Sequence, residues 1–280
     1  MRDDTSAVDC HYSRTKLAAM IMLCGMSLLS VFPLDVLLPS YPAIAHEFDQ
    51  SVAEIAATIS FFILIFAFSQ LIVGPLSDKF GRKLVLMAGL IIVLISVLAC
   101  ALAKNFSLFF MYRTLQAVGC STFVLSQALI QDLLREEDRQ RARIFLVTLN
   151  GVFIASAPLL GSYIQSIFGW QGSFYLTAIV SVCLLVQVFL TLKNNKNLSG
   201  LDLKRTYMPY LKIIRHKYFV IYWCLSGIAF SCHFFIYYSF SIDIFRALGI
   251  ILLSVLVCVV GLWGFIYFRR GCCWQVALSS

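Results

Sequence analysis

Two charged residues lie well inside long apolar runs of the sequence, and they are the first candidates for chemistry. Asp35 lies about six residues before the end of the run over 17–41, and Arg113 lies about seven residues into the run over 106–132. A charge inside a membrane is costly and usually marks a functional site. An acid and a base there can exchange a proton or respond to a charged compound. The alternative is a structural ion pair that joins two helices.

The elements that must position these residues are predicted to be transmembrane helices. The chain has 280 residues, of which 60% are hydrophobic and 13% are charged. A soluble protein is about half apolar and about a quarter charged. A spanning helix needs about 20 mostly apolar residues. Eight runs meet this length: 17–41, 53–75, 84–103, 106–132, 143–166, 172–192, 217–241 and 248–268.

The basic residues between these runs predict how the chain crosses the membrane. Of the 22 lysines and arginines, 19 fall on one side of the alternating runs, two (Lys104 and Arg246) fall on the other, and Arg113 lies within a run. Positive residues favour the cytoplasmic side, so both termini are expected there. Asp35 and Arg113 then lie roughly 10 Å from the same opposite face. The net charge of +8 is therefore read as topology rather than as a nucleic-acid surface.

The runs divide the chain into a larger and a smaller set. The segment 193–216 is polar and basic and contains Gly200 and Pro209, so it is the expected domain boundary. The predicted organisation is a cytoplasmic N-terminal segment (1–16), a six-helix bundle (17–192), a cytoplasmic linker (193–216), two further helices (217–268) and a cytoplasmic tail (269–280).

A short charged turn separates the second and third runs. Gly74 and Pro75 are expected to end the second run, and Asp78 is expected to cap the next helix. Gly81 would allow a sharp backbone bend. The turn should therefore be tight and should lie at the membrane surface.

Basic residues follow this turn and are expected to hold it at the cytoplasmic side. They are Arg82 and Lys83. Asp132 ends the fourth run at the same side, so an Arg82–Asp132 ion pair is predicted that would latch a gate. The alternative is charge that only sets topology, since exposed ion pairs contribute little.

Several uncharged residues within the runs are candidates for a transport path. Polar side chains expected to face a substrate cavity are Gln70, Gln116, Gln127 and Asn150. Pro158 and Gly161 in the fifth run could kink that helix or let another helix approach closely.

Other classes of function are disfavoured by what the sequence lacks. It has no glycine-rich loop ending in Lys-Ser or Lys-Thr for phosphate, so ATP-driven transport is not expected. No Ser/His/Asp or His/Glu metal pattern appears, so no enzyme activity, metal or cofactor is expected. Most of the ten cysteines lie in apolar runs, where cysteine behaves as a small hydrophobic residue.

Four stretches resemble motifs of a known family. The stretch 74–83 (GPLSDKFGRK) resembles the signature loop of the major facilitator superfamily, and it falls between the second and third runs as in that family. The stretch 113–119 (RTLQAVG) is similar to a motif of the drug/proton antiporter branch. The stretch 157–161 (APLLG) resembles the antiporter motif, with Ala157 where glycine is usual. The stretch 35–44 (DVLLPSYPAI) is similar to the bicyclomycin-resistance (Bcr/CflA) subgroup.

The resemblance implies a fold and a function. The fold would be all-α and integral to the membrane, with a major-facilitator-type six-helix bundle and about two helices of a second bundle. The function would be proton-coupled efflux of small drug-like or metabolite compounds across the bacterial inner membrane by alternating access. Asp35 would carry the proton, and Arg113 would control its release. The implied partners are the small-molecule substrate, protons and the lipid membrane.

The number of runs departs from the family pattern. The family has twelve spans, and this chain has about eight, so a truncated member is expected. A non-transporting remnant or membrane interaction protein is one alternative, and an uptake symporter is another. Pairing of two copies of the chain could rebuild a cavity between two bundles.

Overall fold

The computed structural model describes residues 3–192 together with residues 221, 225, 227–229 and 232. The chain divides into two compact units, Met1–Leu201 and Asp202–Ser280, and the first holds nearly all of the described residues. The predicted linker, eighth run and tail lie outside the described residues, as does most of the seventh run.

Six helical spans are long and apolar enough to cross a membrane within the described part. Their bounds are Thr15–Glu47, Glu54–Phe80, Arg82–Ala101, Phe106–Leu133, Glu136–Phe168 and Gln171–Thr191. They coincide with the first six predicted runs. The prediction of an all-helical, multi-pass membrane protein is therefore confirmed for this part of the chain.

Four of the six spans are single helices, and the first and fourth are interrupted by 3₁₀ segments. The first span comprises α1 (Asp3–Asp35), the 3₁₀ helix η1 (Leu38–Ser40) and α2 (Tyr41–Glu47). The second and third are α3 (Val52–Phe80) and α4 (Arg82–Ala101). The fourth comprises α5 (Phe106–Cys120), the 3₁₀ helix η2 (Ser121–Leu125) and α6 (Ser126–Leu133). The fifth and sixth are α7 (Glu136–Phe168) and α8 (Gln171–Thr191).

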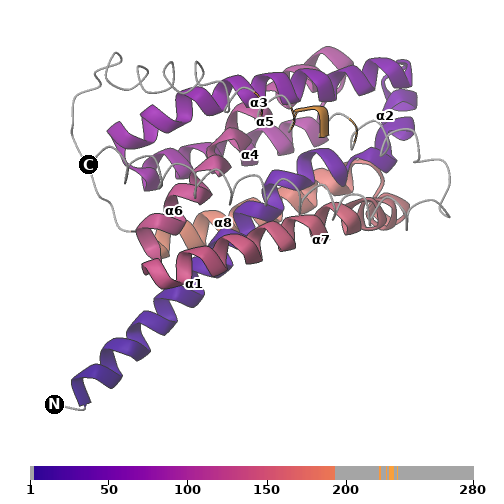
Figure 1. Cartoon of the computed structure of the whole chain (residues 1–280). Helices are drawn as coiled ribbons and strands as arrows, with labels where there is room; N and C mark the ends of the chain where they lie inside the picture. The colour runs from indigo at the N-terminus through magenta and orange to yellow at the C-terminus, as the bar shows by residue number, and fades with distance from the viewer. Residues whose placement is uncertain (1–2, 193–220, 222–224, 226, 230–231, 233–280) are drawn as a thin grey trace. The chain divides into compact units, whose positions relative to one another are not determined.

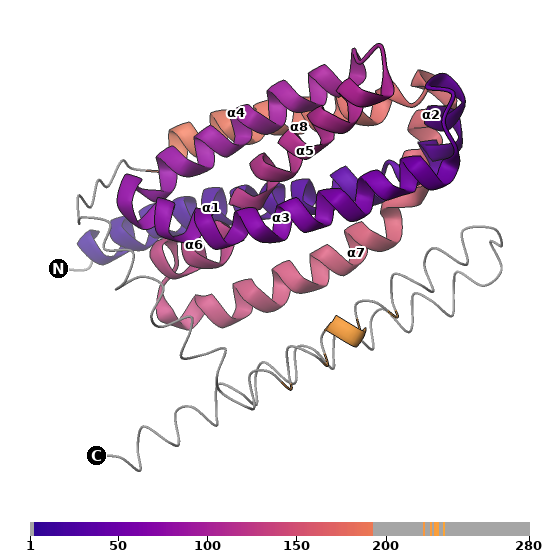
Figure 2. The ribbon, with the colours of Figure 1, turned by 90° about the horizontal axis from the view of Figure 1, so that it is seen from above.

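The helices of the first unit run side by side, with α1 extending beyond the bundle at its N-terminal end (Figures 1 and 2). The main contacts join α7 to α1, α1 to α8, α8 to α4, α4 to α5 and α5 to α3. The helices α3 and α7 thus flank the series. In the most apolar part of each span, only 22% of α3 and 17% of α7 is buried, against 50% of α4 and 56% of the fourth span. They therefore leave the largest apolar faces open within the described part.

Local sequence signals explain where several helices begin and end. The Ser51 hydroxyl accepts the backbone N–H of Glu54 at 3.2 Å, and the Glu54 carboxylate accepts the backbone N–H of Ser51 at 2.8 Å, which forms a capping box at the start of α3. The Asn105 side chain accepts the Leu108 N–H at the start of α5. Gly81 and Gly169 end α3 and α7 with positive φ values of 89° and 69°.

The prediction that Gly74 and Pro75 end the second run is wrong. The helix α3 continues through both residues to Phe80, with Pro75 buried inside it. The Ser77 hydroxyl donates to the Gly74 carbonyl at 2.7 Å. A proline removes one backbone donor, here the one that would bond the Leu71 carbonyl, and membrane helices tolerate such a loss without ending.

The predicted capping role of Asp78 is also wrong. Asp78 lies in the last turn of α3 and is exposed, and α4 begins with Gly81 as its N-cap without a side-chain hydrogen bond. The Gly81 N–H donates to the Ser77 carbonyl at 2.9 Å. The turn is therefore a single glycine between two helices, which is shorter than the sequence suggested.

Two spans expected to be continuous change helix type. The first α-helix ends at Asp35, and the chain proceeds through η1 and α2, which contain Pro39 and Pro42 in their first turns. These prolines supply no backbone N–H and favour helix starts. In the fourth span the hydroxyls of Ser121 and Thr122 donate to the Val118 and Gly119 carbonyls within η2.

Two glycines allow α4 and α5 to cross closely. A Cβ atom at Gly89 would lie 2.2 Å from the Thr122 hydroxyl oxygen, and one at Gly119 would lie 2.9 Å from the Gly89 carbonyl oxygen. Gly119 also closes the stretch 113–119. Small residues at helix crossings are the usual means of close packing in membranes.

Replacing Gly119 by alanine should destabilise the bundle, because the added methyl group has backbone atoms on the facing helix as its neighbours. The expected loss is about 1–3 kcal/mol, the usual cost of overpacking. Thermal unfolding of the purified full chain in detergent measures it. Gly151→Ala is the matched control, since a Cβ there has no atom within 4 Å. Equal melting temperatures for the two variants would contradict the close crossing.

Candidate functional site

Arg113 is fully enclosed in the bundle and only partly hydrogen-bonded. It is 1% exposed. Its Nη1 donates to the Gln116 side-chain oxygen at 2.6 Å, and its guanidinium carbon lies 4.7 Å from the centre of the Phe62 ring on α3. Its Nε and Nη2 are buried without a hydrogen-bond partner among the described residues. Unpaired donors on a buried cation are costly, so this guanidinium has the capacity to bind one more acceptor.

Asp35 is the last residue of α1 and lies next to irregular backbone. Its side chain is half-buried and makes no hydrogen bond or ion pair with any described residue. The first span touches the fourth through contacts of α1 with η2 and α6. The two spans therefore touch in the part of the fourth span beyond Arg113, and no ion pair joins Asp35 to Arg113 in the structure.

The stretch 157–161 of α7 packs directly against the chain beyond Asp35. A Cβ atom at Gly161 would lie 2.1 Å from the Val36 carbonyl oxygen, so only glycine fits. Ala157 and Val36 are buried in one apolar cluster with Phe32 and Ile164. Pro158 lies inside α7 without ending it. The antiporter-like motif thus seals apolar surface around the residue that precedes the break in the first span.

An aromatic cluster covers the end of the bundle nearest to Arg113. Phe109 lies one turn before Arg113 on α5, and its ring makes edge contacts with Trp170 and Phe174 of α8 at 6.2 and 5.9 Å between centroids. Phe48, just after α2, contacts Phe109 and Trp170. These rings join the end of α2, the helix α5 and the start of α8 in one cluster.

The four polar cavity candidates do not converge on one place in the structure. Gln116 is buried and accepts from Arg113, whereas Gln127 is exposed and Gln70 is half-buried, with no hydrogen bond shown for either side chain. Asn150 is half-buried on α7, and its Oδ1 is buried without a donor. Only Gln116 is brought to the Arg113 site. Among the described residues no three His, Cys, Asp or Glu side chains are grouped so as to bind a metal.

The predicted Arg82–Asp132 ion pair is formed. Arg82 Nη1 contacts the Asp132 carboxylate and also donates to the Ala128 carbonyl at 2.7 Å. The first residue of α4 is thereby attached to the C-terminal part of α6. Gly81 makes this possible by turning the chain in one residue, while Asp78 takes no part in the contact.

Lys83, predicted as part of the gating loop and as a charge that holds the turn at the cytoplasmic side, makes a specific contact. Its Nζ donates to the Phe189 carbonyl in the last turn of α8 at 2.8 Å and lies 4.8 Å from the Phe189 ring centre. Arg139 acts similarly, donating to the Gln131 and Leu134 carbonyls at the end of α6. Basic side chains at helix C-termini satisfy carbonyls that lack helical donors.

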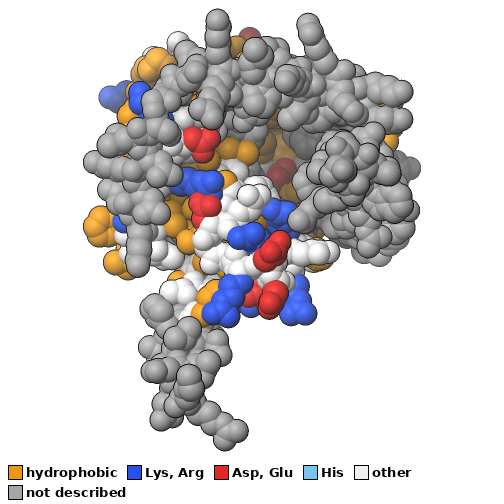
Figure 3. Space-filling model, turned by 60° about the vertical axis from the view of Figure 1, so that its left-hand side comes forward, with side chains coloured by type: hydrophobic (Ala, Val, Ile, Leu, Met, Phe, Trp, Pro, Cys, Tyr) orange, Lys and Arg blue, Asp and Glu red, His pale blue; other side chains and the backbone are white. Residues whose placement is uncertain are grey.

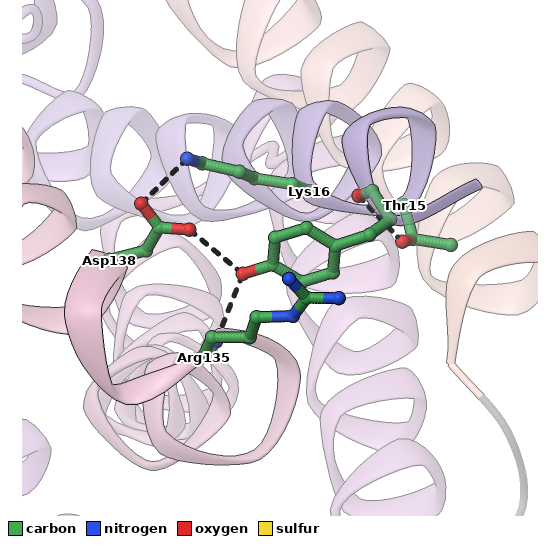
Figure 4. A network of polar contacts seen from close by, with 5 residues as sticks. Thr15, Lys16, Arg135 and Asp138 are labelled. Atoms are coloured by element: carbon green, nitrogen blue, oxygen red, sulfur yellow. Dashed lines mark hydrogen bonds and ion pairs between the residues drawn. The ribbon is translucent and has the colours of Figure 1, made fainter. Parts of the chain in front are cut away.

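A polar network that the sequence did not indicate joins α1 to the start of α7 (Figure 4). Lys16 Nζ donates to Asp138 Oδ1 at 2.7 Å, and the Tyr12 hydroxyl donates to Asp138 Oδ2 at 2.9 Å. The Arg135 backbone N–H donates to the Tyr12 hydroxyl, and its guanidinium lies over the Tyr12 ring at 3.9 Å. The acidic first turn of α7 also suits the positive end of the helix dipole.

Charged side chains of both signs gather at the end of the bundle from which α1 emerges (Figure 3). The spacing of Tyr12 and Lys16, one helical turn apart, could have marked a shared face. The partner Asp138 lies 122 residues beyond Lys16, and no sequence signal connects them. The backbone acceptors of Lys83 and Arg139 carry no residue-type signal at all.

The family model described as "Major Facilitator Superfamily" matches residues 23–280. The chain is 33% identical over 172 residues to "Multidrug resistance protein MdtL" of Citrobacter koseri, which covers 59% of this chain and 43% of that protein. It is 32% identical over 181 residues to the Escherichia coli protein of the same name, covering 62% and 46%.

A further relative carries the name of the subgroup that the first span resembles. The "Bicyclomycin resistance protein homolog" of Haemophilus influenzae is 32% identical over 168 residues, which cover 59% of this chain and 42% of that protein. The matches therefore span less than half of the length of these relatives. The resemblance to the Bcr/CflA subgroup seen in the motifs is confirmed at this level.

A solved structure shares the fold. The human organic anion transporter MFSD10 (TETRAN) superposes with a TM-score of 0.62 over 88% of this chain and 72% of that chain, at 16% sequence identity. Such low identity shows the fold alone. Together with the family match over residues 23–280, these findings show that the chain belongs to the major facilitator superfamily.

Proposed function

We propose that the chain takes part in proton-coupled efflux of small drug-like or metabolite compounds across the bacterial inner membrane. The observation that carries the proposal is the unpaired state of Arg113 and Asp35 on contacting spans. Relatives named for multidrug and bicyclomycin resistance support the direction of transport. Those proteins are about twice as long as the matched part, so the activity of the whole protein is carried over as a proposal.

The arrangement of Arg113 supplies a way to couple a proton to a conformational change. Its free Nε and Nη2 are placed as the fork that binds a carboxylate through two hydrogen bonds. When Asp35 approaches, its carboxyl group would release its proton, and the resulting carboxylate would accept hydrogen bonds from these two donors. When it withdraws, as in the present structure, the carboxyl group is free to take up a proton from the other side. Alternation between the two arrangements is the proposed coupling step.

The contacts at the Gly81 turn support a gate at the cytoplasmic end. Arg82 joins the α3–α4 turn to α6, and Lys83 joins the same turn to α8. Breaking the Arg82–Asp132 pair would free the fourth span to move relative to the turn. The basic residues at this end also support a cytoplasmic position for both termini.

A membrane interaction protein without transport activity is the second candidate. It is favoured by the open apolar faces of α3 and α7, because alternating access requires one bundle to move against another. A second copy of the chain is a partner that would supply the other bundle. Transport measurements on the full chain distinguish the two candidates, since an interaction protein moves no substrate.

Asp35→Asn should abolish proton coupling while leaving the fold intact, because the amide cannot exchange a proton at neutral pH. In everted membrane vesicles, drug-like cations and neutral compounds should release protons with the wild-type chain and at least tenfold more slowly with the variant. Glu47→Gln, at an exposed position of α2, is the control. Undiminished proton-coupled efflux by Asp35→Asn would refute the role of Asp35.

Arg113→Met should raise the melting temperature of the purified chain while lowering coupled transport. The substitution removes a buried charge with two unpaired donors and keeps the contact with Phe62. Exchange of buried charge for apolar groups is often stabilising by about 1–4 kcal/mol. A purely structural role for Arg113 predicts the opposite sign, so a marked fall in melting temperature would favour that role.

The Arg82–Asp132 latch should reveal itself as non-additive effects in a double-mutant cycle. Arg82→Gln and Asp132→Asn each break the same ion pair, so the double variant should transport about as slowly as the slower single variant. The cycle compares the initial efflux rates in vesicles of the unmodified chain, the two single variants and the double variant. Independent, multiplicative losses would show that the two residues act separately. Asp78→Asn is the matched control for loss of one acidic charge in the same region.

A further inference from the structure

An apolar groove opens between α3 and α4. It encloses about 310 Å³, which is within the range of small-ligand pockets. The lining residues come from α3, α4 and the adjoining part of the fourth span. The residues that matter for its shape are Val73, Leu76, Phe80, Leu84, Ala88 and Thr122.

The groove has a buried floor and an exposed rim. Val73, Val85 and Thr122 are between 4% and 6% exposed and form the floor, whereas Leu76, Phe80 and Leu84 are 36%, 42% and 46% exposed and form the rim. The groove therefore opens to the surroundings of the bundle. The Thr122 hydroxyl donates to the Gly119 carbonyl, so the floor offers little to a polar ligand. An elongated apolar group is the fitting occupant.

A lysine side chain, Lys79, lies beside the exposed rim of this groove. Lys79 Nζ lies 5.0 Å from the centre of the Phe80 ring, and Phe80 lines the groove. Of the three basic residues around Gly81, Arg82 and Lys83 are occupied by Asp132 and the Phe189 carbonyl. Lys79 alone makes no hydrogen bond or ion pair with any residue that the structure describes.

We propose that the groove binds an anionic phospholipid, with an acyl chain along α3 and α4 and the phosphate headgroup at Lys79. An acyl chain gains little by moving from the bilayer to an apolar groove, because both surroundings are equally apolar. Preference for this lipid therefore comes from the charge of Lys79 and from the shape of the groove. Lysines at a membrane surface attract anionic headgroups. A zwitterionic lipid of the same chain length fits the groove but gains less from Lys79.

The bound lipid would connect the two helices that meet at Gly81. Its chain would fill the space between Leu76 on α3 and Leu84 on α4, and its headgroup would lie beside the turn that carries Arg82 and Lys83. The lipid composition of the membrane would then affect the contacts of this turn, although the lipid touches neither Asp35 nor Arg113. This inference depends on the membrane location of the chain and not on its transport activity.

Native mass spectrometry of the purified full chain tests the site. Phosphatidylglycerol and phosphatidylcholine with identical acyl chains are titrated onto delipidated protein. We expect phosphatidylglycerol to bind about fivefold more tightly, which corresponds to one lysine near an anionic headgroup. Lys79→Gln should remove this preference, and Ala88→Phe, at the exposed rim, should weaken both lipids.

Matched variants at other exposed positions complete the design. Lys104→Gln removes a lysine from the opposite end of the bundle, and Ala155→Phe adds a ring to an exposed position of α7, so both should bind like the unmodified chain. Phosphatidylglycerol with a photoreactive acyl chain should label residues between 73 and 92. A preference that survives Lys79→Gln, unchanged binding by Ala88→Phe, or labelling confined to other helices would overturn the proposal. Labelling confined to other helices would show that the groove does not hold the lipid.

Discussion

The carbonyl groups at the C-terminal ends of membrane helices lack donors within their own helix, and much of one end of this bundle is arranged to supply them. Lys83 and Arg139 donate to the last carbonyls of α8 and α6, and Arg82 adds a bond to α6 beside its ion pair. Without water such groups are expensive to leave unpaired. The basic residues that sort to one side of the membrane therefore also fasten neighbouring helices together, with Gly81 turning the chain so that both of its following residues can reach.

In the interior of the bundle, by contrast, some polar groups are left without partners. Helix ends are satisfied, whereas Arg113 keeps two buried donors open and Asp35 has no partner within the described part. Close packing at Gly161 and the aromatic contacts of Phe109 hold the surroundings of these two residues in place. A buried guanidinium with two open donors costs stability, and the close apolar packing of the bundle opposes that cost.

Sequence reasoning succeeded where a signal was long or carried by residue type. The six spans follow from apolar runs of sufficient length, and the Arg82–Asp132 pair follows from opposite charges at the same membrane end. It failed at Pro75 because a proline inside a long membrane helix removes one backbone donor without ending the helix. It missed the contact of Lys83 because the acceptor is a backbone carbonyl, which every residue possesses. The link between Tyr12 and Asp138 depends on packing across 126 residues.

The 3₁₀ segment η2 separates the two charged ends of the fourth span. Each of its five residues turns the chain by about 120° instead of about 100°, and rises about 2.0 Å instead of about 1.5 Å. The part of the span that carries Asp132 is therefore rotated by about 100° and displaced by about 2.5 Å relative to one continuous α-helix. Rewinding these five residues as α-helix would swing Asp132 away from Arg82 while Arg113 stays fixed. The 3₁₀ geometry of η2 therefore decides the direction in which Asp132 points relative to Arg113 on the same span.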